Sequence, residues 1–229
     1  TLATRGVRFV DPGAGYLACG WIGKGRLAEP EVIAAAADGM LRQKGTLLGR
    51  CVVVTAGPTY EDIDDVRYIG NRSSGRTGYA LAAEAARRGA RVVLVSGPTR
   101  LDPPAGVEVV RVRRAAEMHN AVQAVASDAD VIVMAAAVAD YAPAEGAQAG
   151  KIEKHDGLLE LRLVPTRDIL AELGHRRGRA PRPVLIGFAA ESGDPIARGR
   201  EKLRRKAVDM IVANDITRAD AGFDSETNA

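Results

Sequence analysis

Polar residues that could bind a phosphate separate the first strongly apolar run of the chain from an alanine-rich helical pattern. Gly57 opens this polar loop, and Ser73, Ser74 and Gly75 close it directly before the helix. Backbone N–H groups in the first turn of a helix lack intrahelical partners, and the helix dipole adds positive potential there. The spacing therefore predicts an anion site in which these four residues supply backbone and hydroxyl donors.

A carboxylate follows another apolar run. Asp140 comes shortly after Ala135, Ala136 and Ala137, at the predicted carboxyl end of a strand. Ligands collect outside such strand ends in open α/β sheets, and small side chains let a ligand approach the backbone. Asp140 could then hold Mg²⁺ or a polar group of a substrate. An aspartate that only closes the strand would explain the same residue.

Two pairs of lysines could attract the phosphates of a nucleotide. Lys202 and Lys206 are spaced by one helical turn and so share a helix face, whereas Lys151 and Lys154 lie in a loop. Charged residues of this kind also occupy plain solvated faces. Phe188 ends a further apolar run, where it could stack on a base or fill the core.

The elements that must position these residues alternate between apolar runs and helical patterns, which is typical of parallel strands joined by crossover helices. We expect an α/β fold, with a Rossmann-like, open, mostly parallel sheet flanked by helices. Residues 142–154 lack periodicity and predict a mobile loop. The predicted strands are residues 51–56, 91–96, 107–111, 131–136, 159–164, 184–188 and 210–213, and the predicted helices are 29–41, 75–88, 115–126, 167–173 and 195–206.

Composition narrows the class of protein. With 229 residues, of which 46% are hydrophobic, the chain can bury a substantial core. A net charge of +3 suits an anionic small molecule at least as well as nucleic acid, and an aromatic content of 4% leaves few rings on which single-stranded bases could stack. Cys19 and Cys51 make no disulfide framework, and neither a signal peptide nor an apolar run of roughly 20 residues is visible, so we expect a cytoplasmic protein.

Two other functions are compatible with parts of this pattern. A nicotinamide-dependent oxidoreductase would carry G-x-G-x-x-G tightly after its first strand and an acidic residue after its second. Here a long loop follows the first strand, the second ends in Val95-Ser96-Gly97, and no Tyr-x-x-x-Lys pair occurs. A nucleic-acid-binding module would use the basic helices as a phosphate-binding surface.

In their order along the chain, these segments resemble bacterial phosphopantothenoylcysteine synthetases, the second half of a bifunctional coenzyme A biosynthesis flavoprotein. The resemblance covers most of the chain. It is carried by residues 55–59, 66–75, 135–141, 151–154, 166–170, 187–191, 202–206 and 213–215. Residues 15–27 resemble the end of the upstream decarboxylase domain, with Cys19 at the position of a cysteine proton donor.

The resemblance implies two parts: residues 1–46 as the end of a decarboxylase domain with its linker, and residues 47–229 as a ligase domain that is truncated at its C-terminus. It further implies CTP-dependent ligation of 4′-phosphopantothenate to L-cysteine through an acyl-cytidylate, with release of pyrophosphate and CMP. A free carboxylate resists attack by an amine until it carries a good leaving group, and Mg²⁺ with fixed cations would offset the repulsion between two anions. FMN would belong only to the absent decarboxylase domain.

The resemblance also assigns roles to residues. Asn71, Lys151 and Arg67 are implied as catalytic, with Arg67 supplied by the second subunit of a homodimer. Ala136 and Ala137 match positions that line phosphopantothenate, alongside Arg67, Asn71 and Asp140. Nucleotide contacts are implied for Asp140, Lys151, Thr166, Arg167, Asp168, Ile169, Phe188, Lys202 and Lys206, with Asp140 near the cation. The small-molecule substrates and the second subunit are the implied partners, without nucleic acid or membrane.

This chain departs from the family pattern at two places. Tyr60 stands where family members carry an arginine, so a phosphate contact is lost if that position faces the ligand. The loop Lys151-Ile152-Glu153-Lys154 has one lysine fewer than the family's Lys-x-Lys-Lys pattern.

Overall fold

The computed structural model describes residues 9–16, 22–26, 28–43, 45–154, 156–191 and 194–215. The chain divides into two compact units, Thr1–Thr46 and Leu47–Ala229. In the first unit, β1 (Gly13–Tyr16) pairs antiparallel with β2 (Ile22–Arg26), and α1 (Pro30–Gln43) follows. The helix predicted at residues 29–41 is therefore confirmed.

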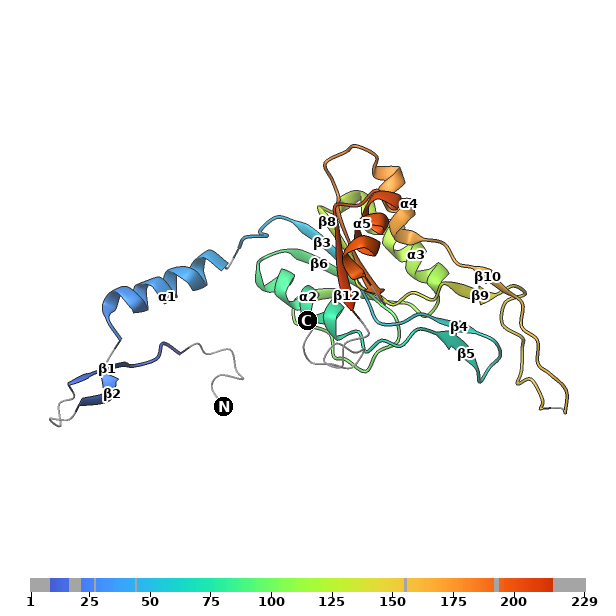
Figure 1. The fold of residues 1–229 in the computed structure, drawn as a ribbon, viewed down its shortest axis with the longest axis horizontal. Coiled ribbons are helices and arrows are strands. Elements are labelled where there is room, and N and C mark those ends of the chain that lie inside the picture. Colours follow the sequence, from blue (N-terminus) through green and yellow to red (C-terminus); the bar gives the residue numbers. More distant parts are fainter. Residues whose placement is uncertain are drawn as a thin grey trace. The chain divides into compact units, whose positions relative to one another are not determined.

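The second unit is built on a parallel sheet whose strand order is β12-β11-β8-β3-β6-β7 (Figure 1). The chain starts at β3 in the middle, winds outward through β6 and β7, and then returns to the other side of β3 through β8. The winding reverses between β3 and β8, which places a ligand crevice outside the carboxyl ends of these strands. The strands are β3 (Cys51–Ala56), β6 (Arg91–Ser96), β7 (Val107–Arg111), β8 (Val131–Met134), β11 (Val184–Glu191) and β12 (Met210–Asp215).

The core explains why the valine-rich runs became central strands. Every residue of β3 is buried, and successive residues point to opposite faces of the sheet. Val53 lies in one apolar cluster with Met118 and Leu173. Val54 lies in a second cluster with Tyr79. Both faces are thus covered, as parallel sheets require, and the predicted α/β fold is confirmed.

Four helices and a 3-10 turn supply this cover: α2 (Arg76–Arg87), α3 (Ala115–Val125), η2 (Ala126–Asp128), α4 (Ile169–Arg177) and α5 (Pro195–Arg205). The four predicted helices of this unit are confirmed, and the largest shift is at α4, which was predicted at residues 167–173. Within the described ranges, no helix combines the length and apolar character that a bilayer crossing requires.

One predicted strand is wrong. Of residues 159–164, only the last two belong to a strand, β10 (Leu163–Pro165), which pairs antiparallel with β9 (Tyr141–Pro143) outside the central sheet. Leu159 and Leu161 are exposed. The alternation of leucine with polar residues is typical of a half-buried strand, but among the described elements none covers its apolar side.

A second short hairpin was not predicted. β4 (Tyr60–Asp62) and β5 (Tyr68–Gly70) pair antiparallel inside the loop that joins β3 to α2. Figure 1 shows this hairpin and the β9–β10 pair on the same side of the sheet, and β4 lies against β9. Strands of three residues are too short to produce a periodic pattern.

Candidate functional site

A cleft of about 1350 Å³ lies at the carboxyl ends of the central strands. Three segments form most of its wall: residues 70–78 before and within α2, residues 134–141 after β8, and residues 165–170 at the start of α4. The remaining lining comes from β11, β12 and α5. This is the switch point of the sheet, where open α/β sheets bind ligands.

Most of the residues predicted from the sequence line this one cleft, although they come from segments more than a hundred residues apart. They are Asn71, Ser73, Ser74, Gly75, Ala136, Ala137, Asp140, Thr166, Arg167, Asp168, Ile169, Phe188, Lys202 and Lys206. The fold therefore brings the predicted nucleotide, substrate and cation positions together.

The loop before α2 is built around glycine. Gly75 is the N-cap of α2 with φ of 80°, and its N–H donates to Ser73 Oγ at 3.3 Å. A Cβ on Gly75 would lie 2.7 Å from Thr99 Cγ2, so both its left-handed backbone and the lack of space require glycine. Gly57 is buried against Gly75 and outside the cleft lining. It therefore supports the predicted anion loop rather than facing a ligand.

Two buried threonines hold the alanine segment after β8. Thr55 Oγ1 accepts a hydrogen bond from Ala136 N–H at 3.1 Å, and Thr59 Oγ1 accepts one from Ala139 N–H at 2.9 Å. Both threonines are completely buried. Asn71 faces the same segment, because its Nδ2 donates to Val138 O at 2.8 Å. The amide predicted to be catalytic is thus anchored to the wall that carries the predicted substrate positions.

The start of α4 faces the lysines of α5. Asp168 is the N-cap of α4 and accepts a hydrogen bond from Ala171 N–H at 3.0 Å. Its carboxylate also pairs with Lys206 Nζ at 3.0 Å. Thr166 donates its hydroxyl to Ala139 O at 2.6 Å, which ties this segment to the alanine segment.

Asp140 is exposed in the cleft, as a metal or substrate ligand must be. Among the described residues, no group of three or more His, Cys, Asp or Glu side chains could hold a metal ion. Mg²⁺ commonly takes only one or two carboxylates and completes its shell with water and substrate phosphates. The residues present therefore fit a magnesium ion that arrives with a nucleotide, rather than one held by protein alone.

Phe188 both packs in the core and faces the cleft, so its position is compatible with both roles considered from the sequence. It is half-buried and packs against the apolar cluster on the α2 side of the sheet, and it also lines the cleft. Three cationic side chains in the lining, Arg72, Arg76 and Arg205, were not predicted from the sequence. The spacing of Arg205 from Lys202 on the same helix was a signal that could have identified it.

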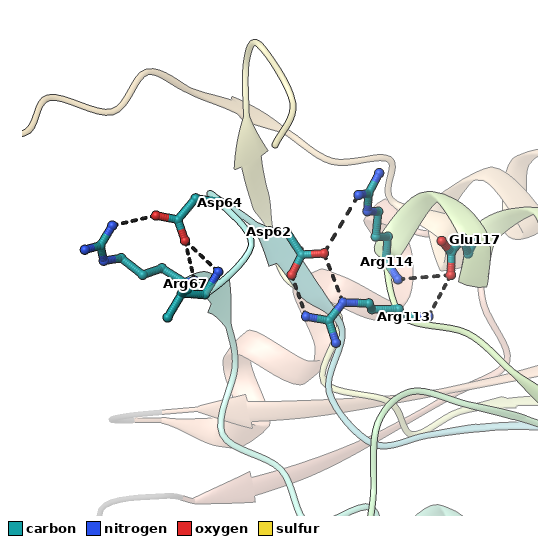
Figure 2. A network of polar contacts seen from close by, with 7 residues as sticks. Asp62, Asp64, Arg67, Arg113, Arg114 and Glu117 are labelled. Carbon is teal, nitrogen blue, oxygen red and sulfur yellow. Dashed lines mark hydrogen bonds and ion pairs between the residues drawn. The ribbon is translucent and has the colours of Figure 1, made fainter. Parts of the chain in front are cut away.

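Arg67 and Lys151 lie outside the cleft lining and close to each other in a different place. The buried carboxylate of Asp64 accepts a hydrogen bond from Arg67 Nη1 at 2.5 Å (Figure 2). It also accepts one from the N–H of Ile152, the residue after Lys151, at 3.1 Å. Burial alone would raise the pKa of Asp64, but hydrogen bonds from the N–H groups of Val66, Ile152 and Arg67, with the Arg67 charge, lower it to about 2.

Tyr60, which stands where the resemblance leads us to expect an arginine, also lies outside the cleft lining. Its ring stacks on Tyr68 at 3.9 Å between centroids, and the Arg113 guanidinium lies 5.5 Å from its centre. Asp62 holds Arg113 through hydrogen bonds of 2.5 and 2.9 Å (Figure 2). Tyr60 is therefore held in the β4–β5 hairpin and does not form part of the cleft wall. Cys19 lies outside the described residues.

Comparison with known proteins identifies relatives of this fold and sequence. Residues 47–229 match the family described as the DNA/pantothenate metabolism flavoprotein C-terminal domain. Over 226 residues the chain is 46% identical to the "Coenzyme A biosynthesis bifunctional protein CoaBC" of Bacillus subtilis (strain 168), covering 97% of this chain and 55% of that protein. It is also 44% identical over 232 residues to a "Cysteine/Cysteine sulfinic acid decarboxylase" of an unknown prokaryotic organism, covering 99% of this chain and 64% of the relative.

A solved structure of the C-terminal domain of CoaBC has the same fold. It superposes with a TM-score of 0.63 at 43% identity, covering 74% of this chain and 79% of that domain. The chain spans about half the length of the CoaBC relative. The resemblance inferred from the order of the motifs is confirmed, and the chain belongs to the DNA/pantothenate metabolism flavoprotein C-terminal domain family.

Proposed function

We propose that this chain ligates 4′-phosphopantothenate to L-cysteine at the expense of CTP, in coenzyme A biosynthesis. The convergence of the predicted nucleotide and substrate residues on a single cleft is the observation that carries the proposal. The name of the CoaBC relatives supports the pathway. The cleft also offers what two anionic substrates need, because Arg76, Arg167, Lys202, Arg205 and Lys206 line it.

The reaction has two steps. The carboxylate of phosphopantothenate attacks the α-phosphorus of CTP, a P–O bond forms, and pyrophosphate leaves. The amine of cysteine then attacks the acyl carbon, an amide bond forms with loss of a proton, and the C–O bond to CMP breaks. The cations of the cleft would stabilise the phosphates, and Asn71 would orient the activated carbonyl.

Magnesium would enter with CTP and use Asp140 as its protein ligand, where it would neutralise charge on the phosphates. Asp140 suits this role because it is exposed and lines the same cleft as the cations of α5.

A second copy of the chain completes the proposal. Arg67 does not line the cleft of its own chain. Large apolar side chains are exposed on the β4–β5 hairpin that carries Arg67, on the β9–β10 pair and on the loop before β10: Val66, Tyr68, Tyr141, Leu158, Leu159, Leu161, Leu163 and Val164. Such a surface suits burial against a partner. We infer a homodimer in which Arg67 of each subunit reaches the cleft of the other.

An assay of pyrophosphate release tests the function. We expect release when the protein is given CTP, Mg²⁺ and 4′-phosphopantothenate, and product when L-cysteine is added. The absence of both pyrophosphate and acyl-cytidylate would contradict the proposal. Replacement of CTP by ATP tests the choice of nucleotide.

Parallel measurements separate the other functions. Binding of NADPH but not CTP would favour an oxidoreductase, and salt-sensitive binding of nucleic acid would favour a binding module. Release of CO₂ from cysteine sulfinic acid would favour the activity named for one relative.

A further inference from the structure

A smaller cleft of about 550 Å³ lies between α3 and α4, beside the main one. It is lined by His119, Gln123, Arg167, Glu172, His175 and Arg176. Arg167 lines the main cleft as well. This arginine is therefore the residue through which side chains of the smaller cleft can act on the larger.

A chain of polar contacts leads from the interior to Arg167. His119 is buried on α3, and its Nε2 lies 2.8 Å from Glu172 Oε2. Its Nδ1 lies 3.2 Å from Asn120 Oδ1, so the ring is held at both nitrogens. The other oxygen of the carboxylate, Glu172 Oε1, pairs with Arg167 Nε at 3.1 Å.

The exposed fraction of the side chains rises from His119 through Glu172 to Arg167. The side chains of His119, Glu172 and Arg167 are 8%, 37% and 68% exposed. An exposed ion pair between two free side chains contributes little, because both must be ordered. Here the buried histidine has already ordered the carboxylate, so the arginine alone must lose freedom when the pair forms.

The carboxylate approaches Arg167 most closely at Nε, at 3.1 Å. Among the described residues, Arg167 forms an ion pair with no carboxylate other than that of Glu172. Two terminal N–H groups of arginine can bind a phosphate in bidentate fashion. An arginine held in advance through Nε loses less conformational entropy when such a phosphate binds.

We propose that His119 and Glu172 are positioning residues that hold Arg167 in the conformation that binds a phosphate of the nucleotide. This inference rests on the proposed function. Neither residue lines the main cleft, so both act through Arg167. The alternative role of Glu172 predicts the opposite result. If Glu172 competed with the phosphate for Arg167, its removal would tighten nucleotide binding.

A double-mutant cycle on the full chain tests the inference. We expect Glu172→Gln and His119→Gln each to weaken CTP binding about 3- to 10-fold in calorimetric titrations, and to have no further effect in the Arg167→Gln background. The KM for CTP should rise in the same proportion, with the KM for 4′-phosphopantothenate unchanged. A purely structural role would not disappear when Arg167 is removed.

Controls keep the result unambiguous. Glu84→Gln removes a carboxylate that also pairs with arginines, Arg87 and Arg88, on a helix face outside both clefts, and it should leave CTP binding unchanged. If His119→Gln fails to fold, Glu172→Gln carries the test, because Glu172 is half-exposed. Unchanged or tighter binding by Glu172→Gln, or effects that add to those of Arg167→Gln, would overturn the inference.

The failure of the proposed function is distinguishable from the failure of this inference. If the wild-type chain binds no CTP, the proposed function fails, and the same set of proteins is titrated with inorganic pyrophosphate. Weaker pyrophosphate binding that depends on Arg167 would support the positioning role, and its absence would overturn that role too.

Discussion

Asp64 and Asn71 lie within the same loop but use their side chains differently. Asp64 is buried and collects hydrogen bonds from the turn of the β4–β5 hairpin and from Ile152. Asn71 is exposed, and its side-chain amide donates one hydrogen bond to Val138 O. The first residue organises structure outside the cleft, and the second places a polar group in its wall.

Asp64 predicts a pH dependence of stability. Its pKa is lowered to about 2 in the folded chain, from an ordinary value of 3.8. A depressed pKa contributes stability above the unfolded value, and this stability is lost as pH falls from about 4 towards 2. We expect Asp64→Asn to lower Tm at pH 7 and to reduce the loss of Tm across that acidic range. The control is Asp65→Asn, which changes the exposed neighbour and should leave the pH dependence of Tm unchanged. If Tm falls equally with pH in Asp64→Asn and wild type, the role of Asp64 is refuted.

Asn71 predicts a separation of binding from turnover. Removal of its amide by Asn71→Ala leaves the cations of the cleft in place, so CTP should still bind. The activated carbonyl would lose its orienting group, and conversion to product should fall by about 10²-fold or more. Calorimetry with CTP and an assay of product measure the two effects on one protein. Wild-type turnover would contradict the assigned role.

At the scale of elements, the loops after β3 and β6 cross at very short range. A Cβ on Gly97 would lie 1.7 Å from Pro58 O, and a backbone oxygen cannot rotate away as a side chain can. The loop that carries the predicted anion site is therefore packed directly on the loop after β6.

This crossing predicts a sharp contrast between two glycines. Gly97→Ala should destabilise the fold by about 3 kcal/mol or more, because the loops must separate. Gly199 is a helical glycine in α5 whose added Cβ would meet no atom closer than 3.6 Å. Gly199→Ala should therefore stabilise the fold by up to about 1 kcal/mol through helix propensity. Urea unfolding of both variants measures the contrast, and equal effects would contradict it.

At the scale of the whole molecule, Arg67 lies outside the cleft of its own chain. Mixing of subunits can therefore test whether Arg67 acts in the cleft of the partner. A subunit with Arg67→Ala and one with Asn71→Ala would each be inactive as a homodimer. In the mixed dimer, one cleft combines an intact Asn71 with an intact Arg67 of the partner. We expect mixing to restore about one quarter of wild-type activity, since half of the dimers are mixed and each has one complete site.

The matched control mixes Asn71→Ala with Asp140→Ala. Both residues line the cleft of one chain, so every site in the mixture lacks one of them. No activity should return. Activity in this control, or none in the first mixture, would contradict a shared site.

Most elements of the central sheet could be predicted from local sequence patterns. β3, β6 and β7 were predicted with the bounds that the structure has. For β3 and β6 the reason is that buried parallel strands are apolar runs, which can be recognised without knowledge of their neighbours. The helices could be predicted from the helical period of about 3.6 residues, which is also a local pattern. The strand predicted at residues 159–164 was wrong for the same reason: alternation signals a face to be covered, and only the fold shows whether anything covers it.

The residue types at the site were also evident in the sequence, through the order of the motifs. Their convergence depended on the strand order, since the reversal between β3 and β8 brings the loop before α2 against the segment after β8. The burial of Gly57 behind Gly75 and the stacking of Tyr60 on Tyr68, outside the cleft lining, followed from that packing. The link from His119 through Glu172 to Arg167 joins residues 53 positions apart on two helices, and no local pattern encodes such a contact. A sequence records which surfaces must be buried, whereas distances between elements arise only when all of those surfaces are buried together.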